Sequence, residues 1–460
     1  MSDDDERTPI WSAAIALGRE RLADGDRSRL VGLGLAWLGA LVAIQGVRHH
    51  TVVVTGSGAG ILLAARGLTI GRRIAPFHIA LTFGLVLLAR WCNDQGNLQA
   101  SAIAMVVGGL SLTLPGEPPM PGNSEQRQRI WSLVNRTSDD TLAPFALRTD
   151  KSYFFSNDHR AAIAYRVRFG TAVVSGDAIG EPGSREGVLQ AFFEHAHAEG
   201  WRVAGLGVSQ RDLPLWQERG FWSLSIGRDV VIDVEGFALT GRAFRNLRQA
   251  VQRTINAGVT TEIVAEAELT EPARAELLKI LHKGKGNTDR GFAMILDKPL
   301  TGEHPGIMMA FARDHEGRIV AAARFASSDQ GRELSLDIPW RVPGAPNGVD
   351  ERLIADMITW AKTNGGRRLS LAFAAFPDIF IEEDRGAIRG VARHAIKVLD
   401  PLIKLESLFR YLRKFHAFDQ HRYVVTKRRN LLPVAVTMLV LEFALIGTFH
   451  RPRRIHKRGG

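Results

Sequence analysis

The hydrophobic pattern divides the chain into an apolar first quarter and a longer part with short amphipathic segments. Four apolar runs separated by short polar loops fill most of the first 115 residues: Leu30–Val47, Val52–Leu68, Pro76–Trp91 and Leu98–Leu114. Each run is close to the length of about 20 residues that a helix needs to cross the hydrocarbon of a bilayer. The pattern predicts an all-α transmembrane region of four helices over residues 28–115, preceded by an N-terminal segment over residues 1–27.

The distribution of arginine predicts which loops face the cytoplasm. Arginines gather before the first run, in the loop after the second run and after the fourth run, whereas the other two loops carry only Arg48 and Arg90 at their edges. Basic loops stay on the cytoplasmic side of a membrane. We therefore expect a multi-pass protein of the cell membrane, with its N-terminal segment and its large C-terminal domain in the cytoplasm.

A fifth apolar run, Leu431–Phe449, lies near the C-terminus and is interrupted by Glu442. Basic residues flank this run on both sides, so a helix that crossed would leave a basic tail outside, against the usual orientation. We expect residues 429–460 to form an apolar helix at the membrane interface or packed on the domain, followed by a basic tail. A true fifth span is the alternative.

The remaining residues have the pattern of a mixed α/β protein. The Pro- and Gly-rich stretch Gly116–Asn123 predicts a linker, and residues 116–140 combine this linker with one helix. After it, the order strand, strand, helix, strand occurs twice. This order predicts an α/β (α+β) fold with two similar modules, over residues 141–260 and 261–428.

The net charge of +11 and the single cysteine limit the classes of function. A pI near 10.1 suits an anionic partner, either a lipid surface or nucleic acid, although the arginine-rich loops of a membrane protein account for part of the excess. Cys92 is the only cysteine, so an intramolecular disulfide and a cysteine-based zinc cluster are excluded. No metal site is predicted.

The first motif that could carry chemistry is a basic helix that follows Gly241. Its arginines recur at helical spacing, on or near one face: Arg242, Arg245, Arg248 and Arg253. Such a ridge predicts binding of phosphates, from RNA or from a lipid head group. A solvated helix face is the alternative.

The second motif is a strand that ends near Asp337 and is followed by Arg341 and the turn Pro346–Gly348. A carboxylate at the end of a strand can orient an amine or take its proton, and a guanidinium can bind phosphate or carboxylate. A helix cap with a salt bridge accounts equally well for the spacing.

The third motif alternates cations and aromatic residues over Leu408–His416, with Arg422 and Tyr423 after it. Its position next to the expected interfacial helix predicts a seat for an anionic phospholipid head. A solvated basic helix is again the alternative.

Several common catalytic fingerprints are absent from the sequence. The chain has no P-loop, no GxSxG, no HExxH and no dinucleotide-binding glycine motif. The turn that holds the pyrophosphate of acyl-CoA is also missing. The nearest stretch, Arg341–Pro346, contains prolines, which have no backbone N–H group to donate.

From about Phe145 to Val425 the chain resembles the C-terminal synthase domain of the phosphatidylglycerol lysyltransferases, the multiple peptide resistance factor family. Seven segments in the same order carry the resemblance: Lys151–Phe155, Ala164–Val167, Ser175–Gly180, Gly236–Arg242, Arg290–Met294, the block from Asp337 to Gly348, and Lys414–His416 with Arg422–Tyr423. The resemblance implies tandem acetyltransferase-like (GNAT) modules that take an activated amino acid from aminoacyl-tRNA.

Members of this family move lysine or alanine onto a glycerol hydroxyl of phosphatidylglycerol, which makes the membrane less negative and weakens the binding of cationic peptides. The resemblance therefore implies a membrane-bound aminoacyltransferase involved in antibiotic resistance, with lysine as the expected amino acid and aminoacyl-tRNA as the donor. It implies no cofactor and no DNA partner. A flippase partner or a homo-oligomer stays open, because four spans are too few for the family's usual translocation unit.

The resemblance also assigns roles to residues at matching positions. The expected catalytic residues are Asp337, Arg341 and Asp289, the expected ligands of lipid phosphate are Lys414, Arg422 and Arg413, and the arginines of the basic helix are expected at the tRNA. One departure stands out, since Trp340 occupies the position of an arginine that the family usually has. An acyltransferase with a different donor and a catalytically degenerate, lipid-binding relative are the alternatives.

Overall fold

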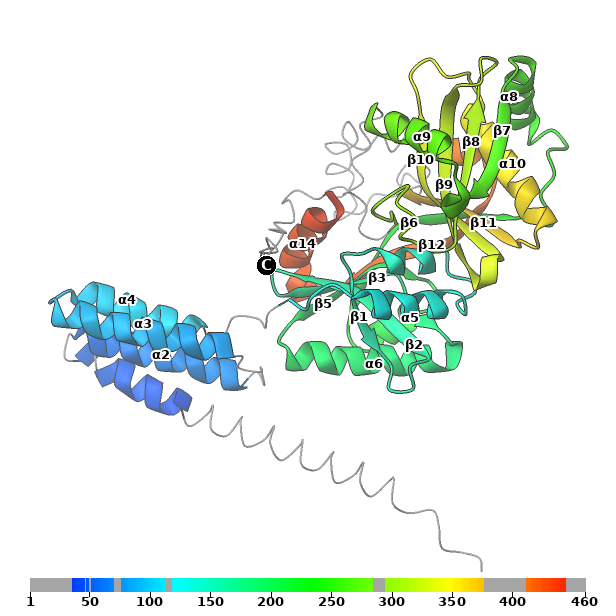
Figure 1. Ribbon diagram of the computed structural model, residues 1–460. Coiled ribbons are helices and arrows are strands. Elements are labelled where there is room, and N and C mark those ends of the chain that lie inside the picture. Colours follow the sequence, from blue (N-terminus) through cyan, green and yellow to red (C-terminus); the bar gives the residue numbers. More distant parts are fainter. Residues whose placement is uncertain are drawn as a thin grey trace, which may run out of the picture. The chain divides into compact units, whose positions relative to one another are not determined.

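The computed structural model describes residues 35–45, 47–48, 51–69, 76–111, 118–283, 294–375 and 411–443 (Figure 1). The chain divides into two compact units, Met1–Pro118 with Phe193–Arg202 and Pro119–Phe192 with Val203–Gly460. The first unit holds the N-terminal helices, and the second holds a large sheet that carries the motifs expected to do chemistry.

The described helices of the first unit include α2 (Val52–Thr69), α3 (Pro76–Asp94) and α4 (Leu98–Ser111). Glycine allows two of them to touch, because a Cβ added to Gly56 of α2 would lie 2.7 Å from the Cα of Ala102 in α4. Small residues at such a contact let two helix backbones approach closely.

The four membrane spans expected from the apolar runs are not confirmed. Among the described residues, no helix has both the length and the hydropathy that crossing a bilayer requires. The multi-pass topology deduced from those runs is likewise not confirmed by this part of the chain.

The second unit is built on a mixed sheet of 12 strands. The strands are β1 (Ser152–Phe155), β2 (Ala161–Arg168), β3 (Thr171–Ser175), β4 (Ile179–Gly180), β5 (Arg202–Ser209), β6 (Trp222–Asp233), β7 (Thr260–Ala265), β8 (Ile307–Arg313), β9 (Ile319–Ser328), β10 (Glu333–Arg341), β11 (Arg368–Ala375) and β12 (Phe418–Thr426). Their order across the sheet is β1-β2-β3-β5-β12-β6-β11-β10-β9-β8-β7, with β4 beside β2. The predicted α/β class is confirmed.

Strands from both predicted modules interleave at the centre of this sheet. Strand β12, from the end of the chain, pairs with β5 on one side and with β6 on the other, antiparallel to both. Strand β6 in turn pairs with β11. Residues 141–260 and 261–428 thus contribute to one continuous sheet, and their description as tandem acetyltransferase-like modules stays a prediction.

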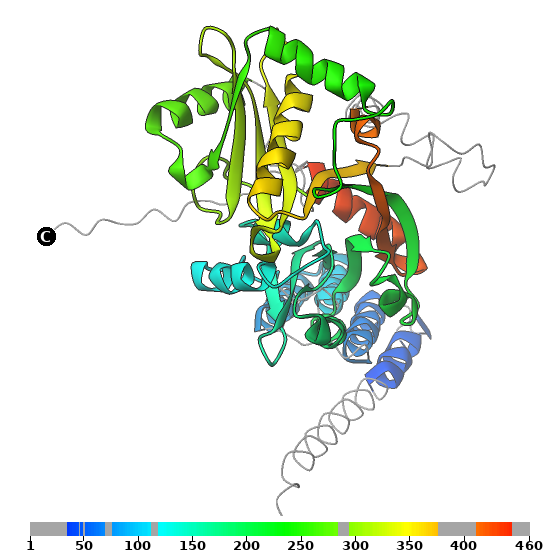
Figure 2. The same cartoon turned by 90° about the vertical axis from the view of Figure 1, so that its right-hand side faces the viewer.

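Helices cover the sheet and close its cores (Figures 1 and 2). They are α5 (Ser124–Val134), α6 (Pro182–Ala198), α7 (Leu213–Gln217), α8 (Arg245–Asn256), α9 (Glu271–Lys283) and α10 (Val349–Thr363), joined by 3-10 turns that include η2 (Glu266–Glu268) and η4 (Arg413–Phe415). Helix α10 packs Leu353 and Met357 into one buried cluster with β10, whereas α9 packs Leu277 into another. Figure 2 shows α10, in yellow, running along the strands.

The C-terminal apolar run begins as α14 (Leu431–Phe443). One side of this helix packs on the sheet, where Met438 and Leu441 contact a small cluster with Val173. Other large apolar side chains of the helix are exposed, and Leu432 is 77 % exposed. The described part of the run therefore packs on the domain, which is one of the two arrangements expected from the sequence.

Candidate functional site

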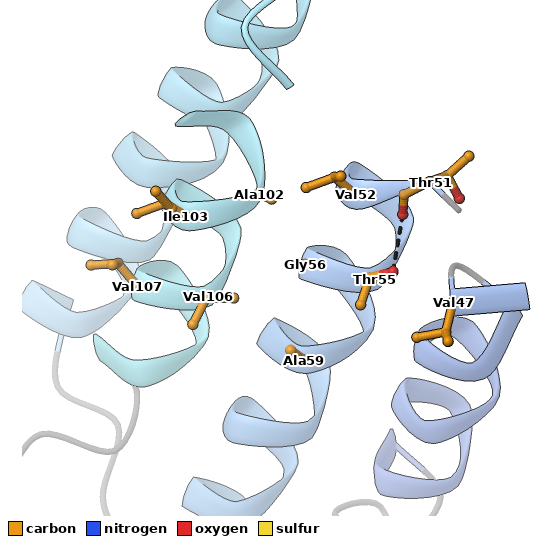
Figure 3. A pocket seen from close by; sticks show the side chains of 10 residues that line it. All are labelled: Val47, Thr51, Val52, Thr55, Gly56, Ala59, Ala102, Ile103, Val106 and Val107. Atoms are coloured by element: carbon orange, nitrogen blue, oxygen red, sulfur yellow. Dashed lines mark hydrogen bonds between the residues drawn. The ribbon is translucent and has the colours of Figure 1, made fainter. Parts of the chain in front are cut away.

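Two cavities in the described part of the chain differ in their chemistry. The larger one, of about 590 Å³, lies among the N-terminal helices (Figure 3). Its lining consists of aliphatic and small residues and two threonines: Val47, Thr51, Val52, Thr55, Gly56, Ala59, Ala102, Ile103, Val106 and Val107. The hydroxyl of Thr55 in α2 donates to the carbonyl of Thr51, the residue that precedes this helix. Because no lining residue is charged, this cavity offers no titratable side chain for proton transfer and no cation to neutralise a phosphate.

The second cavity, of about 470 Å³, lies in the second unit and is polar. We call it the charged pocket, and its lining residues are Arg253, Arg341, Asn347, Gly348, Asp350, Glu351, Tyr411 and Lys414. Its volume falls in the range of roughly 300–1,000 Å³ that is usual for ligand sites. Each of the three motifs found in the sequence contributes to it. The charged pocket is therefore the candidate site.

The position of the charged pocket follows from the topology around β10 and α10. Strand β10 runs parallel to β11 over their first residues, with α10 as the connection between them. In such units ligands bind beyond the carboxyl ends of the strands. Arg341 is the last residue of β10, and Gly348 is the residue that precedes α10.

A close contact between α10 and α8 brings Arg253 to the same place. Gly348 has a φ of +99°, and a Cβ there would lie 2.5 Å from the carbonyl oxygen of Ala250 in α8. Only glycine fits a left-handed conformation at such a short distance. Arg253 follows Ala250 by three residues and therefore lies on the same face of α8.

A β-bulge at Asp337 decides which side chains of β10 face α10. Leu336 packs in the cluster under α10, whereas Ile338 and Trp340 pack in the cluster with α9. In a regular strand residues two apart share a face, but the pairing of β10 with β9 shifts between Leu336 and Ile338. The bulge thereby turns Trp340 into the core and Arg341 toward α10.

Two of the three cations in the charged pocket are paired with carboxylates of the first turn of α10. Arg341 Nη1 donates to Asp350 Oδ2 at 3.2 Å, and Lys414 Nζ donates to Glu351 Oε1 at 2.7 Å. The Lys414 ammonium also lies 5.6 Å from the centre of the Tyr411 ring, a cation–π distance. Burial raises the pKa of Asp350, against the opposing effect of Arg341.

Arg253 differs from these two cations. No acidic partner for its guanidinium is found among the described residues, although it lines the same cavity. All four arginines of the basic helix are exposed, but Arg242, Arg245 and Arg248 do not line the charged pocket, and Arg248 donates to the carbonyl of Leu239 at 2.9 Å. Of the predicted ridge, the geometry brings Arg253 alone to the pocket within the described structure.

Asp337 does not line the charged pocket. It is buried, and its two carboxylate oxygens accept from the Leu296 N–H at 2.8 Å and from Arg324 Nη1 at 2.7 Å. Arg324 is itself fully buried and also donates to Glu266 at 2.7 Å. Burial raises the pKa of Asp337 to about 6, although Arg324 lowers it in part. The predicted catalytic Asp289 lies outside the described residues.

Arg422, expected at a lipid phosphate, is buried in the sheet with 3 % of its side chain exposed. Its guanidinium donates to Asp229 at 2.8 Å, to Asp140 at 3.0 Å and to the carbonyl of Gly207 at 3.1 Å. Burial opposes its charge, but the surrounding carboxylates outweigh burial and raise the pKa of Arg422. These contacts tie β12 to neighbouring segments and do not bring Arg422 to the charged pocket. Arg413 is exposed next to Lys414.

Sequence reasoning assigned no role to Glu351, Tyr411 or Arg324. Glu351 and Tyr411 have weak local signals, since an acid in the first turn of a helix and an aromatic residue near a lysine are common. The sequence around Arg324 did contain a signal that could have identified it as a buried, paired charge. Arg324 is the one charged residue of the strand Ile319–Ser328, every residue of which is buried, and a buried charge requires a partner.

Comparison with known proteins adds a family and two groups of relatives. Residues 131–426 match the model of the family described as phosphatidylglycerol lysyltransferase, C-terminal. The chain is 44 % identical to an MprF-like domain protein of Mycobacterium tuberculosis, over 95 % of this chain and 93 % of that protein. It is 30 % identical to the lysylphosphatidylglycerol biosynthesis bifunctional protein LysX of Gordonia bronchialis, over 96 % of this chain but only 40 % of that longer protein.

Solved structures with a similar fold are also found. The structure of L-PGS from Bacillus licheniformis covers 70 % of this chain and 98 % of its own, with a TM-score of 0.59 and 19 % identity. The C-terminal domain of a putative lysylphosphatidylglycerol synthetase from Agrobacterium fabrum gives a TM-score of 0.59 at 20 % identity, over 70 % of this chain and 98 % of that domain. At these identities the similarity shows the fold.

Proposed function

The chain belongs to the family of phosphatidylglycerol lysyltransferase C-terminal domains, and on this premise we propose that it transfers an amino acid, lysine first, from aminoacyl-tRNA to phosphatidylglycerol. The observation that carries the proposal is the charged pocket. Three cations from segments far apart in the sequence, Arg253, Arg341 and Lys414, line one cavity of ligand size. Both the acceptor lipid and the donor RNA carry phosphodiesters that such cations bind.

The proposed reaction exchanges one ester for another. A glycerol hydroxyl of the lipid attacks the carbonyl carbon of the aminoacyl ester, and the new C–O bond replaces the bond to the ribose oxygen of the tRNA. The proton of the attacking hydroxyl ends on that ribose oxygen. A general base and donors to the developing oxyanion accelerate such a step, and neither an oxidant nor a reductant takes part.

The residues divide between holding the substrates and moving the proton. Arg341 and Lys414 hold the phosphate of the head group and thereby orient its glycerol hydroxyls. Asp337 and Asp289 are our candidates for the proton step. For Asp337 a pKa of about 6 supports the proposal, and the role requires this buried side chain to exchange its present partners, Leu296 N–H and Arg324, for the substrate.

The basic helix α8 gives the donor a place next to the acceptor. Arg242, Arg245 and Arg248 are exposed on or just before α8, and Arg253 on the same helix lines the charged pocket. We assign the exposed arginines to the acceptor arm of the tRNA, where contacts to backbone phosphates position the RNA without reading its sequence. The product lipid carries less negative charge, which would reduce the binding of cationic peptides to the membrane.

The position of Trp340 bears on the alternative of a degenerate, non-catalytic relative. Trp340 is 5 % exposed and packs in the core cluster with α9, on the side of β10 away from α10. A tryptophan there adds to the core, while Arg341 supplies a guanidinium to the charged pocket. The substitution therefore does not favour the degenerate relative over the transferase.

Lipid mass spectrometry tests the proposed function. Membranes of cells that express the chain should contain an aminoacyl-phosphatidylglycerol that is absent when the gene is deleted, and the mass of the head group names the amino acid. Lys414→Ala and Arg341→Gln should reduce this lipid strongly, because each removes a cation from the charged pocket. Arg129→Gln is the matched control, because Arg129 is an exposed arginine of α5 that does not line the charged pocket. Absence of any aminoacyl lipid with the wild-type chain would refute the transferase.

A further inference from the structure

We infer that the charged pocket is a site for a singly charged phosphodiester, and that Asp350 and Glu351 make it reject a phosphomonoester. The inference rests on the proposed function, because it concerns the same pocket. It goes further by stating which ligand charge the pocket selects and which residues select it. It is argued from the ion pairs among the charged groups that line the cavity, and from the burial of Glu351 and the partial burial of Asp350 beside exposed cations.

The charges of the described lining residues leave one positive charge over. Arg253, Arg341 and Lys414 contribute three positive charges, and Asp350 and Glu351 contribute two negative ones. Ion pairs join Arg341 to Asp350 and Lys414 to Glu351. Arg253, without an acidic partner in the described structure, is the cation left to neutralise a ligand.

A phosphodiester fits this balance. It carries one negative charge, and its two free oxygens match the two parallel N–H groups of a guanidinium. A phosphomonoester carries about −1.5 to −2 at neutral pH, because its second pKa is near 6. Its extra charge would face the carboxylates of Asp350 and Glu351.

Burial makes the two carboxylates effective against that extra charge. The side chain of Glu351 is 8 % exposed and that of Asp350 is 29 % exposed, so water screens them less than it screens a surface carboxylate. Both belong to the first turn of α10 and are held there by ion pairs. Neither can swing away from a ligand at low cost.

Binding of two small probes to the full-length protein tests the inference. The probes are glycerophosphoglycerol, a phosphodiester, and glycerol 3-phosphate, a phosphomonoester, and isothermal titration calorimetry at about pH 7.5 measures their Kd values. We expect the wild-type protein to prefer the diester by about tenfold or more, the scale of one unit charge opposed by partly buried charges. Glu351→Gln and Asp350→Asn should each reduce this preference by tightening the binding of the monoester.

Variants of α8 identify the anchor for the ligand. Arg253→Gln should weaken the binding of the diester by about tenfold or more, because it removes the unneutralised cation. Arg129→Gln, at an exposed arginine of α5 that does not line the pocket, should leave this Kd unchanged. Thermal unfolding of each variant verifies that it folds. Equal binding of both probes by the wild type, or equal effects of Glu351→Gln on the two probes, would overturn the inference.

Competition distinguishes the two sources of a phosphodiester. Phosphatidylglycerol vesicles that displace bound glycerophosphoglycerol would identify the lipid head, and an RNA acceptor hairpin that does so would identify the RNA backbone. Displacement by neither would overturn the inference.

An assay of aminoacyl transfer on the same preparations separates this inference from the proposed transferase function. Active protein without a preference for the diester refutes only this inference, and a preference without any transfer refutes only the transferase.

Discussion

Gly348 at the start of α10 lies so close to Ala250 of α8 that an added Cβ would be 2.5 Å from the Ala250 carbonyl oxygen. This contact joins the helix that carries Arg253 to the turn that follows Arg341. Two cations of the charged pocket therefore depend on a residue that has no side chain and takes no part in chemistry.

Gly348→Ala is expected to separate α8 from α10 and to weaken the binding of phosphodiesters. The new methyl group would require both a strained φ and a shift of α8, and strain of this kind costs about 2 kcal/mol. Denaturant unfolding and calorimetry with glycerophosphoglycerol measure the two effects. Gly317→Ala is the matched control, because Gly317 also has a positive φ of +78° but has no atom within 4 Å of an added Cβ. If both variants bind the ligand equally, the contact with Ala250 does not shape the pocket.

Arg422→Gln is expected to destabilise the fold rather than to remove a lipid ligand. Its guanidinium neutralises buried carboxylates such as Asp229 and Asp140, and removing one partner of a buried ion pair costs about 3–5 kcal/mol. Urea unfolding should show this loss, while Arg413→Gln, on an exposed side chain, should change the free energy of unfolding by less than about 0.5 kcal/mol. A stable Arg422→Gln protein that no longer binds lipid would instead support the role implied by the family.

Lys151 is expected to make the protein more stable at alkaline pH. This lysine is fully buried, donates to the carbonyl of Phe145 and to Ser175 Oγ, and has a pKa lowered by burial to about 7. The unfolded chain binds this proton up to about pH 10.5, so it holds more protons than the folded chain above about pH 7, and stability rises with pH in that window. Relative to Lys151→Met, the wild type should gain roughly 3 kcal/mol in the free energy of unfolding between about pH 7 and about pH 9.5.

Lys298→Met, at a side chain that is 44 % exposed, is the control and should leave the pH dependence of the wild type intact. A parallel pH dependence in wild type and Lys151→Met would show that this lysine is charged in the folded protein.

Asp337 is expected to set the acid limb of the pH profile. Its folded pKa, near 6, lies above the ordinary 3.8, so the fold favours the protonated form and stability falls as pH rises from about 3.8 to about 6. Activity should change with pH in the opposite direction to stability, because the protonated Asp337 side chain loses its ion pair with Arg324. The kcat/KM for transfer should therefore decrease below about pH 6, and Asp337→Asn should remove this limb from the profile.

Arg324 separates a direct role of Asp337 from a role in positioning. The side chains of Arg324 and Asp337 both have no exposed surface, and Arg324 holds Asp337 at the bulge that turns Arg341 toward α10. If Asp337 acts through this geometry, Arg324→Met and Asp337→Asn should each lower kcat/KM by about 100-fold, chiefly through KM for the lipid. If Asp337 is the base, Asp337→Asn should lower kcat at every pH, whereas Arg324→Met should raise the pKa of Asp337 and move the acid limb of the kcat profile to higher pH.

The α/β class and the residue types of the site were predictable because they depend on local patterns. Alternating and helical periodicities mark the strands and helices, and the three basic or acidic motifs stand out by composition. The membrane spans were expected from apolar runs counted along the sequence, and they are not confirmed, because no helix among the described residues combines the length and the hydropathy of a span.

The sequence by itself predicted a basic α/β protein, singled out Arg341 and Arg422 as cations for an anionic ligand, and indicated the family by motifs in the right order. Only the tertiary structure decided that Arg341 opens into a pocket while Arg422 is surrounded by Asp140, Asp177 and Asp229. The reason is physical. The charge of an arginine is a local property, but its burial and its partners come from strands and helices that are distant in the sequence, and a single bulge at Asp337 exchanges the faces of all residues after it.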